Sequence, residues 1–233
     1  LSYTNLTDVD LSGKDMTGII LTGADLSGKD LSGTILTGSD LSYTNFTDVD
    51  LSGKDLTGTI LTGVDLSGMD LTGTILTRAD LSYANLAGVD LSGTDLTGAI
   101  FSHASFADAN LENTNLTGAS FVDVDLTKIK NKSLAGSNLF GTSFAYSNLS
   151  GVNLSGVILD ANNLHHANLS GLDFTVADVY DGISFIKSNL SNSNFEGVNL
   201  SPKESYYQVF QNKAYLMRGI TQSLEAKAMI HEE

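Results

Sequence analysis

The sequence predicts an all-β solenoid, in which short units of one kind stack along a single axis. A large apolar residue recurs at every fifth position from Leu1 to Leu126 without a break. Five matches neither the 3.6-residue period of a helix nor the two-residue period of a strand, so the run is neither one amphipathic helix nor a series of hairpins. A fixed short period is typical of stacked units that contact only their neighbours.

The repeating unit is a pentapeptide with a consistent polar pattern around its apolar centre. A small residue stands at i−2, Asp or Asn at i−1, Leu or Phe at i, Ser or Thr at i+1, and often Gly at i+2, as in Ala24-Asp25-Leu26-Ser27-Gly28. Such a short unit suits an extended side followed by a corner, and Gly favours a corner that requires positive φ. Only stacking of one unit on the next could bury the Leu and Phe side chains.

This unit, repeated dozens of times, resembles the pentapeptide-repeat family over nearly all of the chain up to Leu200. The resemblance implies a right-handed quadrilateral β-helix with four pentapeptides per coil, in which positions i and i−2 point inward. The 40 apolar centres would then form about ten coils, a rod of about 48 Å at about 4.8 Å per coil.

A longer period and two slips of the frame divide the chain. Residues 1–40 and 41–80 agree at 32 of 40 positions, which indicates a duplication of two whole coils. The spacing of apolar centres lengthens to eight between Leu126 and Leu134, and the frame slips by one residue between Tyr180 and Ser184. We therefore expect a first solenoid segment at 1–126, an interruption at 127–133 that bulges from the coil over 128–133, a second solenoid segment at 134–200, and a different structure at 201–233.

Residues 201–233 predict a short α-helical segment. A helix start is indicated by Ser201 as N-cap, Pro202 in the first turn, and Glu204 three residues after the N-cap. Apolar residues then follow near helical spacing, which predicts a helix over 202–217. Such a segment would cap the exposed edge of the last coil. The alternative is a homodimer through 201–233, because the family resemblance implies pairing through C-terminal helices.

Composition restricts the partners that the chain can have. The net charge is −15, and residues 1–126 hold 18 acidic and four basic side chains. Such a polyanion repels nucleic acid and anionic lipid and attracts basic surfaces, so we expect no direct binding to nucleic acid or membrane. The sequence has no Cys and no apolar run of the length that a membrane-spanning helix needs. We expect a soluble protein of the bacterial cytoplasm or a module of a secreted effector, a choice that the sequence leaves open.

Isoleucine replaces Asp at i−1, the outward-facing position in the family, in five units of residues 1–126. Exposed apolar columns on an acidic rod suggest a partner surface, although local packing at the corners explains them equally well. The candidate partner surface consists of Ile20, Ile35, Ile60, Ile75 and Ile100.

An unbroken run of Asp at i−1 follows one side of the expected rod. The candidate acidic column consists of Asp10, Asp30, Asp50, Asp70 and Asp90. The 18 carboxylates of residues 1–126, spread over about 30 Å, give about 0.6 charges per Å, close to the value for duplex DNA. The resemblance implies a matching alternative function, because family members mimic DNA and bind type II topoisomerases such as gyrase.

Three further departures or regularities are candidates for function. Lys14, Lys29 and Lys54 occupy i−2, where an unpaired charge inside an apolar axis would be too costly. We expect either that their ends reach past a corner or that these sides of the coil are distorted, a choice that the sequence leaves open. The candidate loop contact lies in the first interruption and consists of Lys128, Lys130 and Lys132. A regular Thr ladder at i+1, which an ice-binding face could use, consists of Thr17, Thr37, Thr57, Thr77, Thr97 and Thr117.

No catalytic or cofactor motif stands out from the repeat, so we predict neither an enzyme nor a cofactor or metal site. The hypothesis that the sequence favours is a non-catalytic scaffold whose rigid rod presents columns of side chains to a protein partner of unknown identity. DNA mimicry is the first alternative, and ice binding through the Thr ladder is the second.

Overall fold

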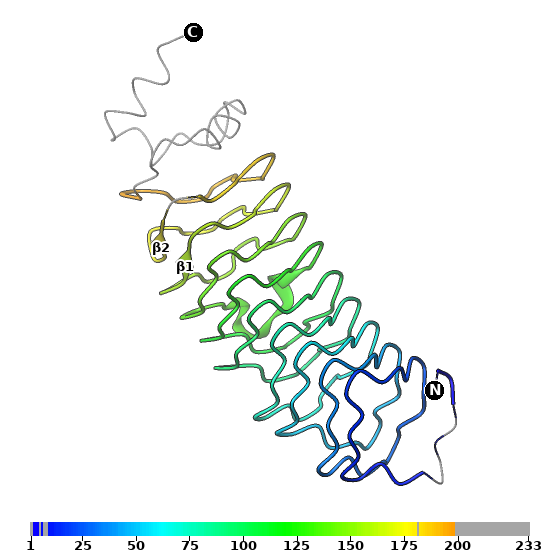
Figure 1. Cartoon of the computed structure of the whole chain (residues 1–233). Coiled ribbons are helices and arrows are strands. Elements are labelled where there is room, and N and C mark those ends of the chain that lie inside the picture. The colour runs from blue at the N-terminus through cyan, green and yellow to red at the C-terminus, as the bar shows by residue number, and fades with distance from the viewer. Residues whose placement is uncertain (1, 5, 7–8, 181, 199–233) are drawn as a thin grey trace.

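The computed structural model describes residues 2–4, 6, 9–180 and 182–198. The chain winds into one continuous solenoid whose coils stack along a single axis (Figure 1). Parallel backbone bridges join position n with position n+20, such as Asp15 with Ile35 and Ile20 with Asp40. One coil therefore consists of four pentapeptides. The right-handed sense of the coil stays a prediction, and the helix expected over 202–217 lies outside the described residues.

Each pentapeptide forms a side and a corner through two kinds of backbone hydrogen bond. Around Leu21, the Ala24 N–H donates to the Leu21 carbonyl at 2.9 Å and closes a four-residue turn. The third residue of that turn, Gly23, has φ of 65°, as a type II turn requires. The Leu21 N–H donates instead to Asp40 in the next coil, at 2.7 Å. The corners thus close within a coil, and the sides bind neighbouring coils.

Regular secondary structure is sparse because only one or two residues of each side are in extended pairing. In the described residues, the elements are the 3₁₀ turns η1 (Leu126–Lys128) and η2 (Lys130–Lys132) and the strands β1 (Ile158–Leu159) and β2 (Asp178–Val179). Strands β1 and β2 pair in parallel, Ile158 with Asp178 and Leu159 with Val179. All other pairing between coils consists of isolated bridges over these residues.

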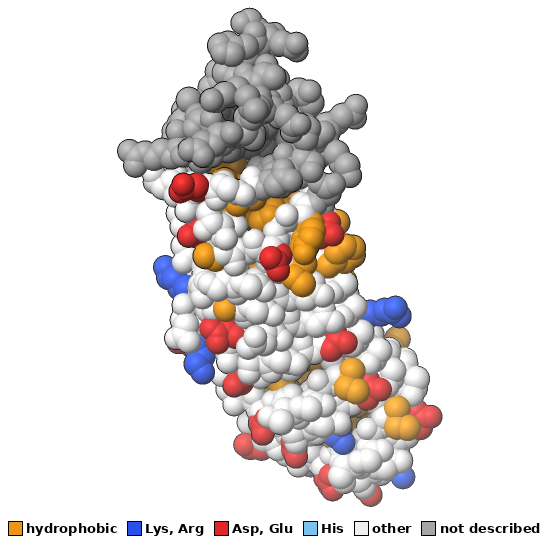
Figure 2. Space-filling view, turned by 90° about the vertical axis from the view of Figure 1, so that its left-hand side faces the viewer, with side chains coloured by type: hydrophobic (Ala, Val, Ile, Leu, Met, Phe, Trp, Pro, Cys, Tyr) orange, Lys and Arg blue, Asp and Glu red, His pale blue; other side chains and the backbone are white. Residues whose placement is uncertain are grey.

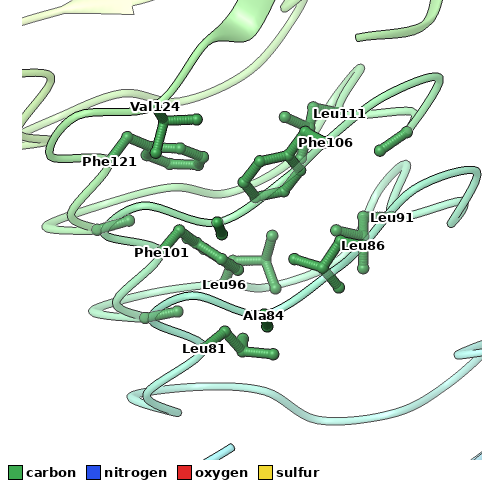
Figure 3. Packing of buried hydrophobic residues seen from close by; sticks show 14 of the residues in the cluster. Leu81, Ala84, Leu86, Leu91, Leu96, Phe101, Phe106, Leu111, Phe121 and Val124 are labelled. Atoms are coloured by element: carbon green, nitrogen blue, oxygen red, sulfur yellow. The ribbon is translucent and has the colours of Figure 1, made fainter. Parts of the chain in front are cut away.

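The core runs along the axis and consists of the residues at i, with most residues at i−2 beside them. Leu81, Phe101 and Phe121 lie one above another on one side of the coil (Figure 3). The rings of Phe101 and Phe121 stack with centroids 4.9 Å apart, and Phe121 continues onto Phe144 at 5.3 Å. Burial of this continuous column is the main source of stability for a chain whose units are too short to fold alone.

The first interruption is smaller than the sequence predicts, and Lys128–Ser133 does not bulge as a whole. Ile129 is buried as an i−2 residue, and the Lys130 N–H donates to the Ala109 carbonyl of the preceding coil at 2.8 Å. One coil earlier, the Asn110 N–H donates to the Val89 carbonyl in the same way. Ser133 bridges Asn153 in the ordinary n+20 register, so three of the four residues between Ile129 and Leu134 are extra. The three extra residues shift the bridge partner of position n from n+20 to n+23, as in the bridge of Asn115 with Asn138.

A second, shorter insertion lies between Val179 and Ser184. Ile158 of β1 pairs with Asp178 of β2, at position n+20, whereas the next bridge joins Asn163 with Ser184, at position n+21. Gly182 follows the slip with φ of 84° and lies against Ala161 of the neighbouring coil. One extra residue is thus absorbed at a corner while the core column continues through Phe185.

Candidate protein-binding surfaces

The isoleucines at i−1 face outward, with 39% to 54% of each side chain exposed. They do not form a continuous apolar column, because Asp separates them. Ile20 bridges Asp40, Asp40 bridges Ile60, and the alternation continues to Ile100. Ile35 and Ile75 alternate in the same way with acidic residues on another side. Figure 2 shows one side of the rod, where single hydrophobic side chains lie among acidic ones over the lower, N-terminal part.

The acidic column, by contrast, has no neutral residue between successive coils. Asp10, Asp30, Asp50, Asp70 and Asp90 are all exposed. Each carboxylate also accepts a hydrogen bond from the backbone N–H two residues later, as Asp50 does from Ser52 at 2.8 Å. The hydroxyl and N–H of Ser52 hold the pKa of Asp50 below its ordinary value, and the equivalent bonds lower the pKa of the others. These side chains both support the turns and present negative charge.

The other three sides of the rod keep neighbouring carboxylates apart. Ile alternates with Asp on two of them, and Asn alternates with Asp on the third. On that third side, the Asn45 amide donates to the Asp25 carboxylate at 3.0 Å, and Asn85 does the same for Asp65. All four sides derive from the same long repeat, that of residues 1–40. Duplication alone therefore does not explain why carboxylates of consecutive coils stack on one side only.

A groove of about 640 Å³ runs beside the acidic column. Four carboxylates line it, from Asp48, Asp50, Asp65 and Asp70, together with the partly apolar surface of Met69 and Val49. In the part of the chain that the structure describes, no group of three or more acidic or His side chains is placed to hold a metal ion. The groove is an acidic surface beside the column.

In one column of i−2 residues, a lysine takes the place of a Thr hydroxyl that bonds to the preceding coil. The Thr34 hydroxyl donates to the Leu11 carbonyl at 2.7 Å, and Thr74 donates to Leu51 in the same way. Between them in the same column, Lys54 Nζ donates to the Leu31 carbonyl. Lys29 Nζ reaches the Val9 carbonyl at 3.2 Å. Lys29 and Lys54 are half-buried and Lys14 is exposed, so their charges stay at the corners rather than in the core.

These lysines also lie beside the acidic column. The positive charges of Lys14 and Lys29 contribute to the lowered pKa of Asp10, after the hydrogen bonds from Ser12. Lys54 acts likewise on Asp30 and Asp50. The negative field of the column is therefore partly compensated over its first three coils.

The lysines of the first interruption are exposed, and they are not isolated from the acidic column. Lys128 lies in η1, and Lys130 and Lys132 lie in η2. Of the three, Lys130 contributes to the lowered pKa of Asp90, after the hydrogen bonds from Ser92. The structure thus places this candidate loop contact next to the C-terminal end of the acidic column.

The hydroxyls of the Thr ladder make internal hydrogen bonds in three of its members. Thr17, Thr97 and Thr117 donate to the side chains of Asp15, Asp95 and Asn115, at 2.5 to 2.7 Å. Only Thr17 is exposed, and the other five are half-buried. This geometry gives the hydroxyls a role in supporting the turns.

One corner of the rod carries aromatic side chains, which were not among the residues expected to be functional from the sequence. Position i+2 at one corner of the rod holds Tyr or His in six coils: Tyr3, Tyr43, Tyr83, His103, Tyr146 and His166. Tyr83 stacks on His103 and Tyr146 on His166, each with ring centroids 4.7 Å apart. His103 Nδ1 also lies 3.1 Å from Asp123 Oδ2. The detectable signal was Tyr at a Gly position, recurring at the same place in successive copies of the long repeat.

Comparison with known proteins agrees with this architecture. Pentapeptide repeats match the chain in eight copies, over residues 1–38, 39–78, 74–108, 101–130 and 137–175. No curated protein matches it. Among the described residues, no helix has the length and apolar character needed to cross a membrane.

Similar solved structures include two pentapeptide-repeat proteins and a resistance protein. HetL, involved in heterocyst differentiation regulation in the cyanobacterium Nostoc sp. strain PCC 7120, is 26% identical, with 82% of this chain and 89% of HetL covered and a TM-score of 0.35. QnrB1, a plasmid-mediated fluoroquinolone resistance protein, is 20% identical, with 91% and 96% covered and a TM-score of 0.37. Rfr23 from the cyanobacterium Cyanothece 51142 is 32% identical, with 50% and 67% covered and a TM-score of 0.23. With its coils of four pentapeptides and the family match over most of its length, this chain belongs to the pentapeptide-repeat family.

Proposed function

We propose that the chain is a non-catalytic scaffold that binds a protein partner on the outside of its rod. One observation carries this proposal: parallel bridges between positions n and n+20 align exposed side chains in straight columns, one residue per coil. The rigid core keeps these columns at a fixed spacing of about 4.8 Å. Such a surface recognises a partner with little ordering of its own side chains, which limits the entropy lost on binding.

The contact surface in this proposal is the pair of columns that contain Ile. Because Asp alternates with Ile there, a suitable partner needs both apolar and basic groups. Asp40 illustrates the pattern, since it lies between Ile20 and Ile60 and accepts a hydrogen bond from the Thr22 hydroxyl at 2.9 Å. The charge of residues 1–126 would speed the approach of a basic partner, and the Ile side chains would supply apolar contact.

The test compares two sets of neutral substitutions in a partner-capture assay at several salt concentrations. Replacing Ile20, Ile60 and Ile100 with Asn removes the apolar contact without adding charge. We expect this variant to lose the captured partner at all salt concentrations. The matched control replaces Ser120, Ser143 and Ser184, which continue the same column, with Asn and should retain it. Loss in the control, or retention by the Ile variant, would argue against the Ile columns.

DNA mimicry is the second candidate, and the uninterrupted acidic column favours it. Asp10 to Asp90 place carboxylates in five successive coils, close enough for Asp10 to act on Asp30 and Asp50 on Asp70, where every other side has neutral spacers. The partner in this case would be a type II topoisomerase such as gyrase, whose DNA site is basic. The nearby charges of Lys14, Lys29 and Lys54 weaken this field, which is why we place the scaffold first.

Inhibition of gyrase supercoiling distinguishes the two candidates. A mimic acts through its field, so replacing Asp10, Asp30, Asp50, Asp70 and Asp90 with Asn should relieve the inhibition, and added salt should weaken it steeply. The control replaces Asp25 and Asp65, on a side where Asn separates the carboxylates. No inhibition by the unaltered chain would exclude mimicry of the DNA that gyrase binds and would leave the scaffold proposal unaffected.

A further inference from the structure

One corner of the rod carries exposed tyrosines at a regular interval. Tyr3, Tyr43 and Tyr83 occupy position i+2 in every second coil, and we call these three residues the tyrosine corner. Their side chains are 78%, 61% and 60% exposed. The spacing of two coils places successive tyrosines about 9.6 Å apart along the rod. An exposed array of three large aromatic side chains with one spacing is a feature that the core does not require.

The tyrosines occupy a backbone conformation that disfavours them. Tyr3, Tyr43 and Tyr83 have φ of 56°, 56° and 60°, in the left-handed region, where a bulky residue is rare. Most other corners hold Gly at this position. Other non-Gly residues, such as Arg78 and Lys187, also adopt this conformation, so the turn itself does not require Tyr at these three positions.

The position of the rings is fixed by the neighbouring coil. A Cβ atom on Gly63 would collide with Cε1 of Tyr43, and one on Gly23 would collide with Cε1 of Tyr3. The rings thus fill the space that a side chain at Gly23 or Gly63 would need. Tyr83 packs instead on the His103 ring. Each tyrosine is therefore held in place and still exposes more than half of its side chain.

Carboxylates flank the tyrosine corner on both sides. Asp40 precedes Tyr43 by three residues, and Asp25 and Asp65 follow Gly23 and Gly63 by two residues on the adjoining side. Hydrogen bonds from Ser27 and Ser67 lower the pKa of Asp25 and Asp65, so both are ionised at neutral pH. Aromatic rings with negative charge beside them attract cations, through the ring quadrupole and through the charge itself.

We propose that the tyrosine corner binds an extended basic segment of the protein partner, with one Arg or Lys side chain on each ring. The inference rests on the proposed scaffold function and specifies the chemistry of its partner. A polyproline II helix repeats every three residues, about 9.3 Å, which matches the spacing of about 9.6 Å between the tyrosines. Side chains on one face of a β-strand recur about every 6.7 Å and do not match. The segment is therefore a polyproline II stretch with a basic residue at every third position.

The test uses two synthetic peptides with four arginines each. In the first, Arg-Pro-Pro repeats four times, so that the arginines recur at every third position. In the second, Arg-Pro repeats four times and is followed by four Pro, so that composition and charge are the same and only the spacing differs. Fluorescence anisotropy with the full chain at physiological salt gives the dissociation constants. We expect the first peptide to bind at least about fivefold more tightly than the second.

Three variants of the chain test whether the tyrosines cause the tighter binding of the first peptide. Replacing Tyr3, Tyr43 and Tyr83 with Asn, which tolerates positive φ, should weaken binding of the first peptide about tenfold, given the usual strength of exposed cation–π contacts. Replacing the same residues with Phe keeps the rings and should keep the affinity within about twofold. Tyr146→Asn is the matched control, because Tyr146 also has positive φ and stacks on a His, but has no Asp at i−1 on its own side or the next in its coil. It should leave binding unchanged.

Equal binding of the two peptides, or unchanged binding by the Asn variant, would overturn the inference and leave the scaffold function standing, because general charge attraction would then explain the result. No binding of either peptide would also overturn it. The proposed contact through the Ile columns fails by a different result, namely retention of the captured partner after the Ile substitutions described above, and the scaffold function itself fails if the unaltered chain captures no partner. Circular dichroism confirms that each variant is folded before its affinity is compared.

Discussion

At the scale of single residues, the repeat assigns each position one physical task. Leu and Phe at i fill the axis, Asp or Asn at i−1 accepts hydrogen bonds from the residue two further on, and i+2 turns the corner with positive φ. Departures from the pattern are tolerated where the new side chain performs the same task. Lys54 shows this, because its Nζ donates to the Leu31 carbonyl as Thr34 and Thr74 do to theirs.

Gly63 and Gly68 provide a matched test of the packing at the tyrosine corner. Both have positive φ, 67° and 66°, but only a Cβ at Gly63 would collide with a ring, that of Tyr43. Gly68→Ala should cost about 1–2 kcal/mol for the left-handed conformation alone. Gly63→Ala should cost more, because the Tyr43 ring must move. Urea unfolding measures both values, and the excess should vanish when Tyr43→Asn is already present. An excess that persists without the ring would contradict this packing.

Because several Asp side chains have lowered pKa values, the free energy of unfolding of the rod depends on pH. An Asp in the unfolded chain has a pKa of about 3.9, and hydrogen bonds from Ser12 and Ser52 hold the pKa of folded Asp10 and Asp50 below their ordinary value. Such carboxylates stabilise the fold above the unfolded pKa, and this contribution is lost as the pH falls through the folded values. We expect the urea midpoint to be nearly constant from pH 7 to 5 and to fall below about pH 4.

The serine hydroxyls are the physical cause of this acid sensitivity, so their removal is the control. Ser52→Ala removes the hydroxyl that donates to Asp50 at 2.6 Å. The pKa of Asp50, measured by NMR titration of its carboxyl carbon, should rise toward the ordinary value, while that of Asp70 should change little. A pKa of Asp50 that is the same with and without the Ser52 hydroxyl would show that the hydrogen bond is not its cause.

At the scale of elements, the solenoid accepts insertions without losing its register. Residues 126–130 complete an ordinary pentapeptide, with Ile129 buried at i−2 and Lys130 bonded to Ala109. The extra Asn131 and Lys132 then turn through positive φ, 56° and 49°. The sequence located this interruption through the frame slip but not its true length, because buried Ile129 is distinguished from a loop residue only by its contact with the neighbouring coil.

Deleting three residues of this interruption should therefore restore a regular coil. Without Asn131, Lys132 and Ser133, Leu134 follows Lys130 directly and the five-residue frame is continuous. We expect this deletion to keep the melting temperature or raise it, because two left-handed residues are removed. Deleting only Asn131 and Lys132 leaves one residue out of frame and should lower it. Thermal denaturation by circular dichroism compares the two, and equal melting temperatures would contradict the assignment of Ile129 and Lys130 to the frame.

At the scale of the whole molecule, one rule of geometry produces several surfaces. A coil of four pentapeptides converts a linear repeat into columns, and the duplication of two whole coils makes their features recur in every second coil. The fold could be predicted from the sequence because the apolar period alone requires stacked units. The alternation of Ile20 with Asp40 follows from the same rule once the coil length is known. The recurrence of Tyr at a Gly position was visible in the sequence, but the fit of Tyr43 over Gly63 was not, because it depends on the relative position of two coils.

Distances along the acidic column test the central claim, that positions n and n+20 are stacked one coil apart. The chain has no Cys, so Asp10→Cys with Asp90→Cys, and Asp10→Cys with Asp173→Cys, each accept two spin labels at unique positions. The residues of the first pair are four coils apart and those of the second pair eight coils apart. Pulsed electron–electron double resonance should therefore give narrow distance distributions centred at about 19 Å and about 38 Å. A broad distribution, or a second distance that is not about twice the first, would contradict the stacked columns on which every proposed surface depends.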